Sequence, residues 1–368
     1  MAAHTLIEVP SGVQCFVGEE ARRRREIEGR VLGVFEGWAY EEIIPPLFDY
    51  ADVFSGPALT PKTYSFVSRD GSLLALRPDF TSLIAKIAAG RLAHRAVPLR
   101  LYYSGEVLRY EPPKAGRQGE LYQMGLERLG GDRLRGDAEV LAIAAECLEA
   151  AGVADFVLAV GHVGVFAGLL RGCEVDPAAL ETLRGRVEAK DEGGVRDALG
   201  HARVPAPVAD AVRRLGRLSG PREVLDEAAR AFAFSEPART AVAELSSLAA
   251  ALAAAGLESR LSIDLGEVRG LDYYTGLVFR AFARGLGFEA GGGGRYDALL
   301  SRFGRPLPAV GFMLGLDRLA LLLEKQGQGA ARPAPAAETL AAGDLAEDLR
   351  RARERRKAGA RIRFGDGR

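Results

Sequence analysis

Apolar and polar positions repeat with two different periods along this chain, and each period predicts one type of element. Apolar residues recur at the spacing of one helix face in four segments: 18–38, 81–91, 137–151 and 314–325. Apolar and polar residues alternate, or apolar residues run together, as in strands in six segments: 40–44, 63–67, 72–76, 100–110, 120–129 and 155–160. Turn residues at 68–71 and 112–116 predict that two pairs of these strands form hairpins.

The helical period dominates one continuous part of the chain. Asp176 and Pro177 form a helix start, and Ala, Arg, Leu and Glu then recur at helical spacing to about Gly256. Strand patterns return in three segments: 260–265, 272–283 and 308–313. We therefore predict an α+β fold, in which an antiparallel sheet is flanked by helices and the chain contains a helical insertion. The predicted divisions are a core in two parts, 1–175 and 257–325, the insertion, 176–256, and a linker with an Arg-rich C-terminal helix, 326–368.

The charge balance argues against one class of function. Lys and Arg together number 49, Asp and Glu also number 49, and the formal net charge is zero, whereas nucleic-acid binders carry a basic excess. The N-terminus does not resemble a signal peptide. The longest apolar stretch, 248–257, is too short to span a membrane. These patterns predict a cytoplasmic protein without a membrane segment.

The histidines and cysteines are scattered along the sequence. Cys15, Cys147 and Cys173 fit no zinc spacing, and we expect them to be small buried hydrophobic residues. No Ser, Cys or His constellation indicates nucleophilic catalysis. The sequence therefore predicts neither a metal centre nor a cofactor.

Asp79 and Thr81 stand at the junction between a predicted strand and a predicted helix. A carboxylate and a hydroxyl two positions apart could receive an ammonium group through charge-assisted hydrogen bonds. Either residue could instead cap the helix that follows, which is a role that Asp and Thr strongly favour. From these residues alone, capping is the favoured interpretation. Asp137, before another apolar run that ends at Gly152, is interpreted in the same way.

Polar residues share one face of the second predicted hairpin. Arg109 shares a face with Glu111 in the first strand, and Gln123, Gly125 and Glu127 share a face in the second. Such a face is either exposed to solvent or forms the floor of a ligand site. A glycine within a strand often marks the close approach of a ligand or another backbone, which favours the ligand site.

A later motif combines an arginine with two tyrosines. Arg269, Tyr273 and Tyr274 could offer hydroxyls and ring faces to a small polar ligand, or they could belong to an ordinary turn that feeds a strand. The glycine run 291–294 is interpreted as entering a helix. It could admit a ligand close to the backbone, but it matches neither the P-loop nor the dinucleotide-binding fingerprint.

Arg318 stands near the start of the predicted helix 314–325. Such an arginine could contact a phosphate-bearing ligand. More often it pairs with a neighbouring acid, and Asp317 and Glu324 are the plausible partners.

The order of these motifs resembles the core of a class II aminoacyl-tRNA synthetase. The motifs are Arg77-Pro78-Asp79-Phe80-Thr81, the Arg-x-Glu strand with its Gln-x-Gly-x-Glu partner, Arg269-Gly270-Leu271-Asp272-Tyr273-Tyr274, Gly293-Gly294-Arg295-Tyr296-Asp297 and Gly315-Leu316-Asp317-Arg318-Leu319. The last three are similar to motifs of the histidyl-tRNA synthetase lineage. The resemblance covers roughly residues 10 to 325.

Two families within that lineage are similar to this chain: the synthetases, and the regulatory subunits of ATP phosphoribosyltransferase. Asp79-Phe80-Thr81 looks like the regulatory form, because the synthetases have Glu-Gly-Thr there. Gly119 stands where the synthetases carry a second arginine of their motif 2 loop. The 44 residues from Lys325 to Arg368 are expected to be too few for the anticodon-binding domain that follows in the synthetases.

The resemblance to the regulatory subunits implies a non-catalytic protein with no catalytic residue of its own. It implies a short-form ATP phosphoribosyltransferase catalytic subunit as partner, a homodimer within a hetero-oligomer, and L-histidine as ligand and feedback inhibitor; binding of tRNA is not expected. A histidyl-tRNA synthetase-like enzyme core without the anticodon-binding domain is the alternative. A plain interaction or amino-acid-binding module with another partner is a third possibility.

The resemblance also assigns residues to an expected histidine site. Asp79 and Thr81 would hold the α-ammonium group, with Gln123 nearby. Glu127 and Tyr274 would contact the imidazole. The remaining expected site residues are Tyr273, which would line the wall, and Arg109 and Arg269, which would take the carboxylate end.

A remnant of a nucleotide site is expected beside this pocket, on the same resemblance. Its residues would be Arg109, Glu111, Arg117 and Arg318.

Overall fold

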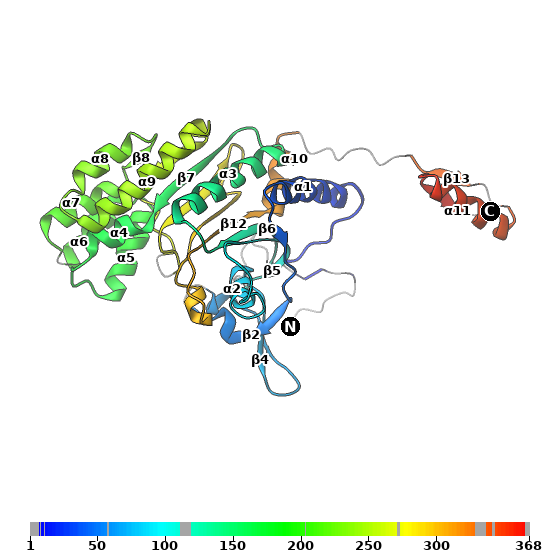
Figure 1. Ribbon diagram of the computed structural model, residues 1–368, viewed down its shortest axis with the longest axis horizontal. Coiled ribbons are helices and arrows are strands. Elements are labelled where there is room, and N and C mark those ends of the chain that lie inside the picture. The colour runs from blue at the N-terminus through cyan, green and yellow to red at the C-terminus, as the bar shows by residue number, and fades with distance from the viewer. Residues whose placement is uncertain are drawn as a thin grey trace. The chain divides into compact units, whose positions relative to one another are not determined.

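The computed structural model describes residues 7, 9–10, 12–56, 59–110, 119–202, 204–270, 273–327, 336–340 and 343–364. Its contacts divide the chain into two compact units, one up to Gly329 and one from Ala330 onward. The first unit contains the sheet and most of the helices (Figure 1).

A nine-stranded sheet forms the centre of the first unit. Its order is β1 (Glu41–Glu42), β5 (Leu99–Leu108), β6 (Glu120–Leu129), β12 (Ala309–Gly315), β11 (Gly291–Arg295), β10 (Leu277–Ala283), β7 (Phe156–His162), β9 (Leu261–Asp264) and β8 (Ser219–Gly220). The β1–β5 and β7–β9 pairs are parallel, and the other pairs are antiparallel. The α+β prediction is therefore confirmed, with two parallel pairs added. The predicted hairpin is the long antiparallel pair β5–β6.

Helices cover one face of this sheet. These are α1 (Gly18–Gly37), α3 (Arg133–Ala151) and α10 (Leu316–Lys325), and α1 contacts both of the others. Residues Met124 and Leu126 of β6 join the hydrophobic core on this side. Because side chains alternate along a strand, the intervening residues of β6 face the opposite side. There, Leu129 packs in a second core with residues of α2 (Thr81–Ala89).

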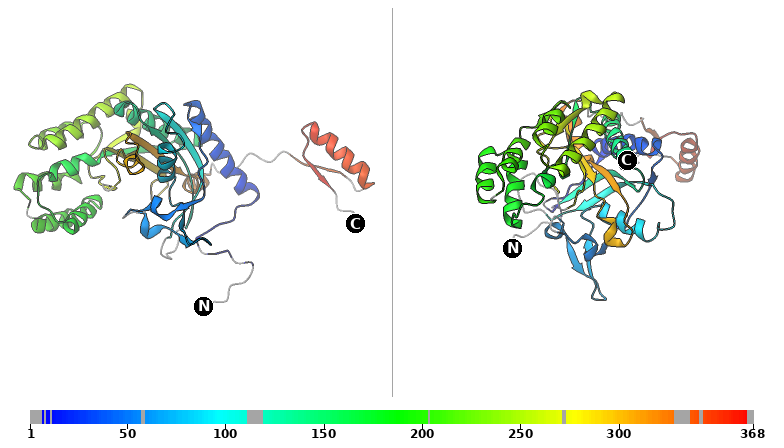
Figure 2. Two further views of the ribbon diagram at one scale, coloured as in Figure 1. Left: turned by 60° about the horizontal axis from the view of Figure 1, so that its bottom comes forward. Right: turned by 60° about the vertical axis from the view of Figure 1, so that its left-hand side comes forward.

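A group of helices lies at the β7 end of the sheet (Figure 2). It contains α4 (Val163–Leu170), α5 (Pro177–Glu188), α6 (Glu192–Ala202), α7 (Ala206–Leu215), α8 (Val224–Ala231) and α9 (Glu236–Ala254). Asp176 caps α5, as predicted, by accepting hydrogen bonds from the backbone N–H groups of Ala178 and Ala179. Strand β8 was not predicted. These helices belong to the same compact unit as the sheet, and the insertion boundaries 176–256 stay a prediction.

A small three-stranded sheet precedes α2. It consists of β2 (Phe48–Tyr50), β4 (Leu73–Leu76) and β3 (Ser65–Val67), in that order. The predicted hairpin turn is confirmed, because the Gly71 N–H donates to the Ser68 carbonyl at 3.0 Å. Short 3-10 helices follow β2 (Ala51–Phe54), precede β3 (Thr60–Lys62), precede β9 (Glu258–Arg260) and follow β11 (Leu300–Phe303).

The glycine run is a strand, so the prediction that it enters a helix was wrong. Residues 291–295 form β11 between β10 and β12 in the middle of the sheet. A Cβ on Gly291 would collide with the Met313 carbonyl oxygen, and one on Gly293 with the Gly311 carbonyl oxygen. The neighbouring backbone therefore occupies the space that side chains would need.

The start of α3 also differs from the prediction. Asp132, and not Asp137, is the N-cap, because its carboxylate accepts a hydrogen bond from the Arg135 N–H at 2.8 Å. Asp137 lies within the helix and pairs with Arg295, which is only 1% exposed, at 2.6 Å. A buried arginine needs a counter-charge, and Asp137 supplies it.

The cysteine prediction holds for one residue and fails for another. Cys147 is buried, whereas Cys15 is exposed and Cys173 is intermediate. Cys15 precedes α1 in the N-terminal segment, outside the hydrophobic cores.

The second compact unit contains more than the single Arg-rich helix that was predicted. Strands β13 (Glu338–Leu340) and β14 (Ile362–Phe364) pair in parallel, and α11 (Leu345–Lys357) connects them in sequence. Arg355 of α11 binds Glu338 with two nitrogens, at 3.0 and 2.6 Å. This ion pair attaches the helix to the small sheet.

Candidate ligand-binding site

Glu127 lies at the centre of the polar face that the sequence predicts on β6. Its side chain is 2% exposed and accepts a hydrogen bond from the Thr81 hydroxyl at 2.7 Å and another from the Tyr296 hydroxyl. Burial raises the pKa of Glu127 to about 8, although the two hydrogen bonds oppose this shift; the nearby Asp79 adds to it. At neutral pH this carboxyl is therefore mostly protonated.

Asp79 stands beside Glu127 and also caps a helix. Its carboxylate accepts from the Ser82 N–H at 2.7 Å and from the Ser82 hydroxyl at 3.2 Å, at the start of α2. The capping interpretation is thus confirmed for Asp79. Burial raises the pKa of this carboxyl too, and the charges of Arg109 and Arg302 oppose the shift. Two acidic groups of reduced acidity therefore lie close together in the site.

Aromatic rings form the walls around these acids. The Tyr103 ring, which is 2% exposed, stacks on Phe80 with centroids 4.2 Å apart. Tyr273 stacks on Tyr296 at 5.5 Å and meets the edge of Tyr274 at 5.2 Å. Rings with hydroxyl groups at their rims are suited to enclosing a small flat polar ligand.

Gly125 gives Tyr103 the space it needs. The two residues are paired across the β5–β6 hairpin, and a Cβ on Gly125 would collide with the Tyr103 hydroxyl. The same Cβ would lie 2.5 Å from the Phe312 carbonyl oxygen of β12. The glycine therefore admits a neighbouring side chain and also, as the sequence suggested, the close approach of another backbone.

Gln123 offers hydrogen-bonding groups that the protein itself does not use. It is 4% exposed, on the same face of β6 as Glu127. Within the part of the chain that the structure describes, its carboxamide has no hydrogen-bond partner. Its amide atoms are not among the fully buried side-chain atoms that lack a partner, so they remain accessible, and a ligand that pairs with them would gain hydrogen bonds.

The two arginines expected at the carboxylate end lie at the edge of this site. The Arg109 Nε donates to the Pro78 carbonyl at 2.8 Å. The Arg269 Nε lies 3.2 Å from a Glu267 oxygen and 3.1 Å from a Glu188 oxygen. Burial and the Glu127 charge raise the pKa of Tyr274 to about 12. The positive charges of Arg109 and Arg269 oppose that shift.

The expected nucleotide residues are only partly visible. Glu111 and Arg117 lie outside the residues that the structure describes. Arg318 donates to the Glu289 carbonyl at 2.8 Å and pairs with its carboxylate at 3.1 Å. An acidic partner for Arg318 was expected, but the choice of Asp317 or Glu324 was wrong.

Those two acids pair with the first helix instead. Asp317 binds Arg24 at 2.5 Å, and Glu324 lies 3.9 Å from Arg23. Both contacts join α10 to α1.

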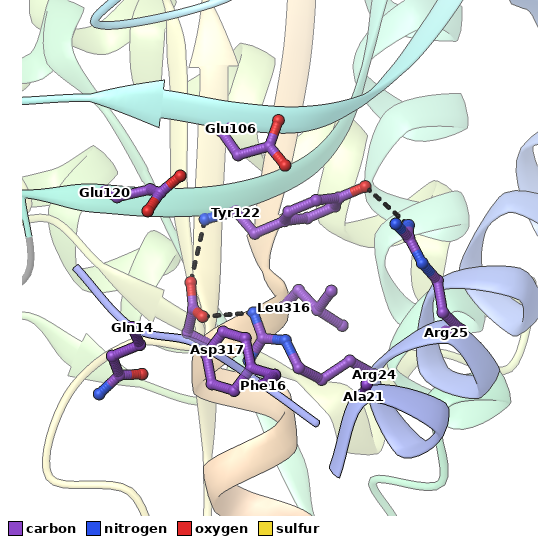
Figure 3. A pocket seen from close by; sticks show the side chains of 10 residues that line it. All are labelled: Gln14, Phe16, Ala21, Arg24, Arg25, Glu106, Glu120, Tyr122, Leu316 and Asp317. Carbon is purple, nitrogen blue, oxygen red and sulfur yellow. Dashed lines mark hydrogen bonds and ion pairs between the residues drawn. The ribbon is translucent and has the colours of Figure 1, made fainter. Parts of the chain in front are cut away.

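A separate cavity lies on the helix-covered side of β6 (Figure 3). It has a volume of about 270 Å³ and is lined by Gln14, Phe16, Ala21, Arg24, Arg25, Glu106, Glu120, Tyr122, Leu316 and Asp317. None of these is a residue that the sequence predicts for ligand binding. Both arginines are already paired, Arg24 with Asp317 and Arg25 with Glu28. This cavity is therefore distinct from the Glu127 site.

Two site residues were missed at the level of sequence. Tyr103 shares a face of β5 with Val107 and Arg109, so the strand period could have indicated it. Tyr296 belongs to a quoted motif, but its contact with Glu127 spans 169 positions. No local pattern could have shown that contact.

The described ranges contain neither a metal-binding cluster nor a membrane-spanning helix. No three His, Cys, Asp or Glu side chains among them are grouped as metal ligands would be. Nor does any described helix have the length and hydrophobicity needed to cross a membrane.

The sheet order, the helices that cover one face of the sheet and the polar site on the opposite face of β6 define a class II aminoacyl-tRNA synthetase-like protein. The family model described as histidyl-tRNA synthetase matches residues 12–319. A crystal structure of a histidyl-tRNA synthetase from Nostoc sp. PCC 7120 has a TM-score of 0.81 over 99% of this chain and 87% of that one, and at 23% identity it supports the fold alone.

Relatives with higher sequence identity to this chain have a name other than histidyl-tRNA synthetase alone. The ATP phosphoribosyltransferase regulatory subunit of Moorella thermoacetica is 40% identical over 365 residues, which are 98% of this chain and 93% of that protein. The one from Geobacter sulfurreducens is 40% identical over 86% of this chain and 73% of that protein. The structure of an ATP phosphoribosyltransferase regulatory subunit/histidyl-tRNA synthetase from Bacillus halodurans C is 29% identical, with a TM-score of 0.85 over 99% and 94% of the two chains. The chain belongs to the family of ATP phosphoribosyltransferase regulatory subunits.

Proposed function

We propose that this chain is a non-catalytic sensor of histidine in histidine biosynthesis. It would bind L-histidine in the Glu127 site and change the activity of a short-form ATP phosphoribosyltransferase catalytic subunit. The name of the family supports the regulatory role. The observation that carries the choice of ligand is the Glu127 site itself, in which buried acids, an unpaired amide and aromatic walls lie together.

The chemistry of these residues suits an amino acid with an imidazole ring. A neutral imidazole has one donor and one acceptor nitrogen. A carboxyl with a pKa of about 8 can donate a proton to the acceptor nitrogen, or ionise and accept from the donor. Asp79 would receive the ammonium group, and Gln123 would complete its hydrogen bonds. Arg109 and Arg269 would meet the carboxylate.

The proposal extends to the assembly and its place in the cell. We expect a homodimer within a hetero-oligomer with the catalytic subunit, in the cytoplasm. For histidine to regulate that assembly, it must bind the active and inhibited states with different affinities.

Titration calorimetry with L-histidine tests the ligand. The wild-type chain should bind, and Glu127→Gln should weaken binding about tenfold to a hundredfold, because a glutamine can neither give a proton to the imidazole nor ionise to accept a hydrogen bond from it. Glu120→Gln is the matched control, since Glu120 begins the same strand on the opposite face. No binding by the wild-type chain, or equal binding by Glu127→Gln, would reject the histidine site.

Reconstitution with the short catalytic subunit tests the regulatory role. Transfer of the phosphoribosyl group to ATP should require this chain and should fall as histidine is added. A catalytic subunit that is fully active alone and indifferent to this chain contradicts the proposal.

A histidine-activating enzyme is the second candidate function. It is favoured by Arg109, Arg269 and Arg318, which match the synthetase motifs. It predicts histidine-dependent exchange between ATP and pyrophosphate. Absence of exchange at saturating histidine and ATP would exclude it.

A further inference from the structure

Arg269 is shared between the core and the inserted helices. Its Nε lies 3.2 Å from Glu267, in the turn after β9, and 3.1 Å from Glu188, the last residue of α5. Glu267 is buried, with a side chain only 1% exposed, and it also pairs with Arg280. Glu188 is about one-third exposed. Arg269 thus has one fixed acidic partner and one accessible partner.

The same arginine is joined to the candidate site through its turn. The Tyr273 and Tyr274 N–H groups donate to the Gly270 carbonyl at 2.8 and 2.6 Å, and the Tyr274 ring packs over Gly270. Gly270 has a φ of +69°, a conformation that favours glycine. Any movement of Arg269 would therefore take place next to Tyr273 and Tyr274, the two tyrosines of the aromatic wall.

Glu188 is poorly placed to hold Arg269 permanently. Burial raises the pKa of the Glu188 carboxyl; Arg269 opposes this shift, but the neighbouring Glu267 charge adds to it. Two carboxylates therefore share one guanidinium and repel each other. A third carboxylate that approaches Arg269 would displace that of Glu188, because Glu188 is the more exposed of the two acids and belongs to a separate helix, α5.

We infer that Glu188 is a built-in competitor for the ligand carboxylate. Glu188 pairs with Arg269, and a ligand carboxylate takes its place on binding. The end of α5 then loses one of its ion pairs with the core. This inference rests on the proposed function, since it assumes that a histidine carboxylate reaches Arg269, and it names a route by which occupancy would reach the inserted helices.

A neighbouring ion pair supplies a control. Lys190, two residues beyond Glu188, pairs with Asp264 at the end of β9 at 3.0 Å. This pair also joins the end of α5 to the core, but it involves neither Arg269 nor a carboxylate that competes for it. Removal of Lys190 therefore loosens the same junction without removing the competitor.

Titration calorimetry of histidine on three full-length chains tests the competition. Glu188→Gln should bind histidine roughly twofold to fivefold more tightly than the wild-type chain, the range expected for a partly exposed ion pair, and Lys190→Gln should not bind more tightly. If Glu188→Gln binds no more tightly, or if both variants tighten binding equally, the competition is wrong. If the wild-type chain does not bind histidine at all, the proposed function fails together with this inference.

Hydrogen exchange tests the structural consequence. Histidine should increase amide exchange at the C-terminal end of α5 in the wild-type chain and have a smaller effect there in Glu188→Gln. Unchanged exchange at this end in the histidine-bound wild-type chain would contradict release of α5.

Discussion

Substitution of Glu127 by glutamine should remove a pH dependence of stability. In the folded chain the pKa of Glu127 is about 8, against an ordinary value of 4.5, because the carboxyl is buried. Between these two values the folded chain holds a proton that the unfolded chain has released. The stabilisation from this group is therefore full below about pH 4.5 and is lost as the pH rises through 8.

The magnitude follows from the linkage relation. One proton difference changes the free energy of unfolding by about 1.4 kcal/mol per pH unit. From pH 5.5 to 7.5 the wild-type chain should lose up to about 2.7 kcal/mol relative to Glu127→Gln. Glutamine is always neutral, and its carboxamide can still pair with the Thr81 and Tyr296 hydroxyls, so the variant should keep the fold.

The assay is urea denaturation of both chains at pH 5.5, 6.5 and 7.5. The difference in free energy of unfolding should shift steadily in favour of Glu127→Gln as the pH rises. A difference between wild type and Glu127→Gln that stays constant across these pH values would refute the reasoning.

Two further predictions concern the fold. Gly293→Ala should destabilise the chain by about 3 kcal/mol or more, or prevent folding, because its Cβ meets the backbone of β12; Gly185→Ala in α5, where the Cβ meets nothing within 4 Å, should be neutral or stabilising by up to about 1 kcal/mol. Chemical denaturation compares the two, and equal effects would contradict the steric argument. Asp137→Ala should cost about 3–5 kcal/mol, since it leaves the buried Arg295 without its main partner, whereas Asp132→Ala should cost only about 1 kcal/mol for a lost cap. If Asp132→Ala lowered the denaturation midpoint more than Asp137→Ala, the ion pair would stabilise the fold less than the helix cap does, contrary to this prediction.

Side-chain periodicity explains which elements could be predicted. The β5–β6 hairpin and helices α1 and α2 carry clear apolar and polar alternation, and the structure confirms them. Strand β11 carries none, because four glycines in succession have no side chains to alternate. Its assignment depends on the neighbouring strands, which no local pattern describes.

The candidate site, too, could be predicted from the sequence only in part. Gln123 and Glu127 could be placed on one face from their spacing, and the structure keeps them on that face. The contacts that determine the acidity of the site could not be placed, because Tyr296 and Glu127 are 169 positions apart. The partner of Arg269 on α5 is another contact between distant segments.

Strand β6 has a consequence for how this fold diversifies. Its even-numbered residues, such as Met124 and Leu126, pack beneath the helices, while Gln123 and Glu127 face the candidate site. Mutations at positions 123 and 127 can therefore alter ligand chemistry without changing the residues packed beneath the helices. Selection can act on the two sets almost independently within ten residues. One short strand thus gives descendants of a common ancestor a means of acquiring new specificities without having to evolve a new fold.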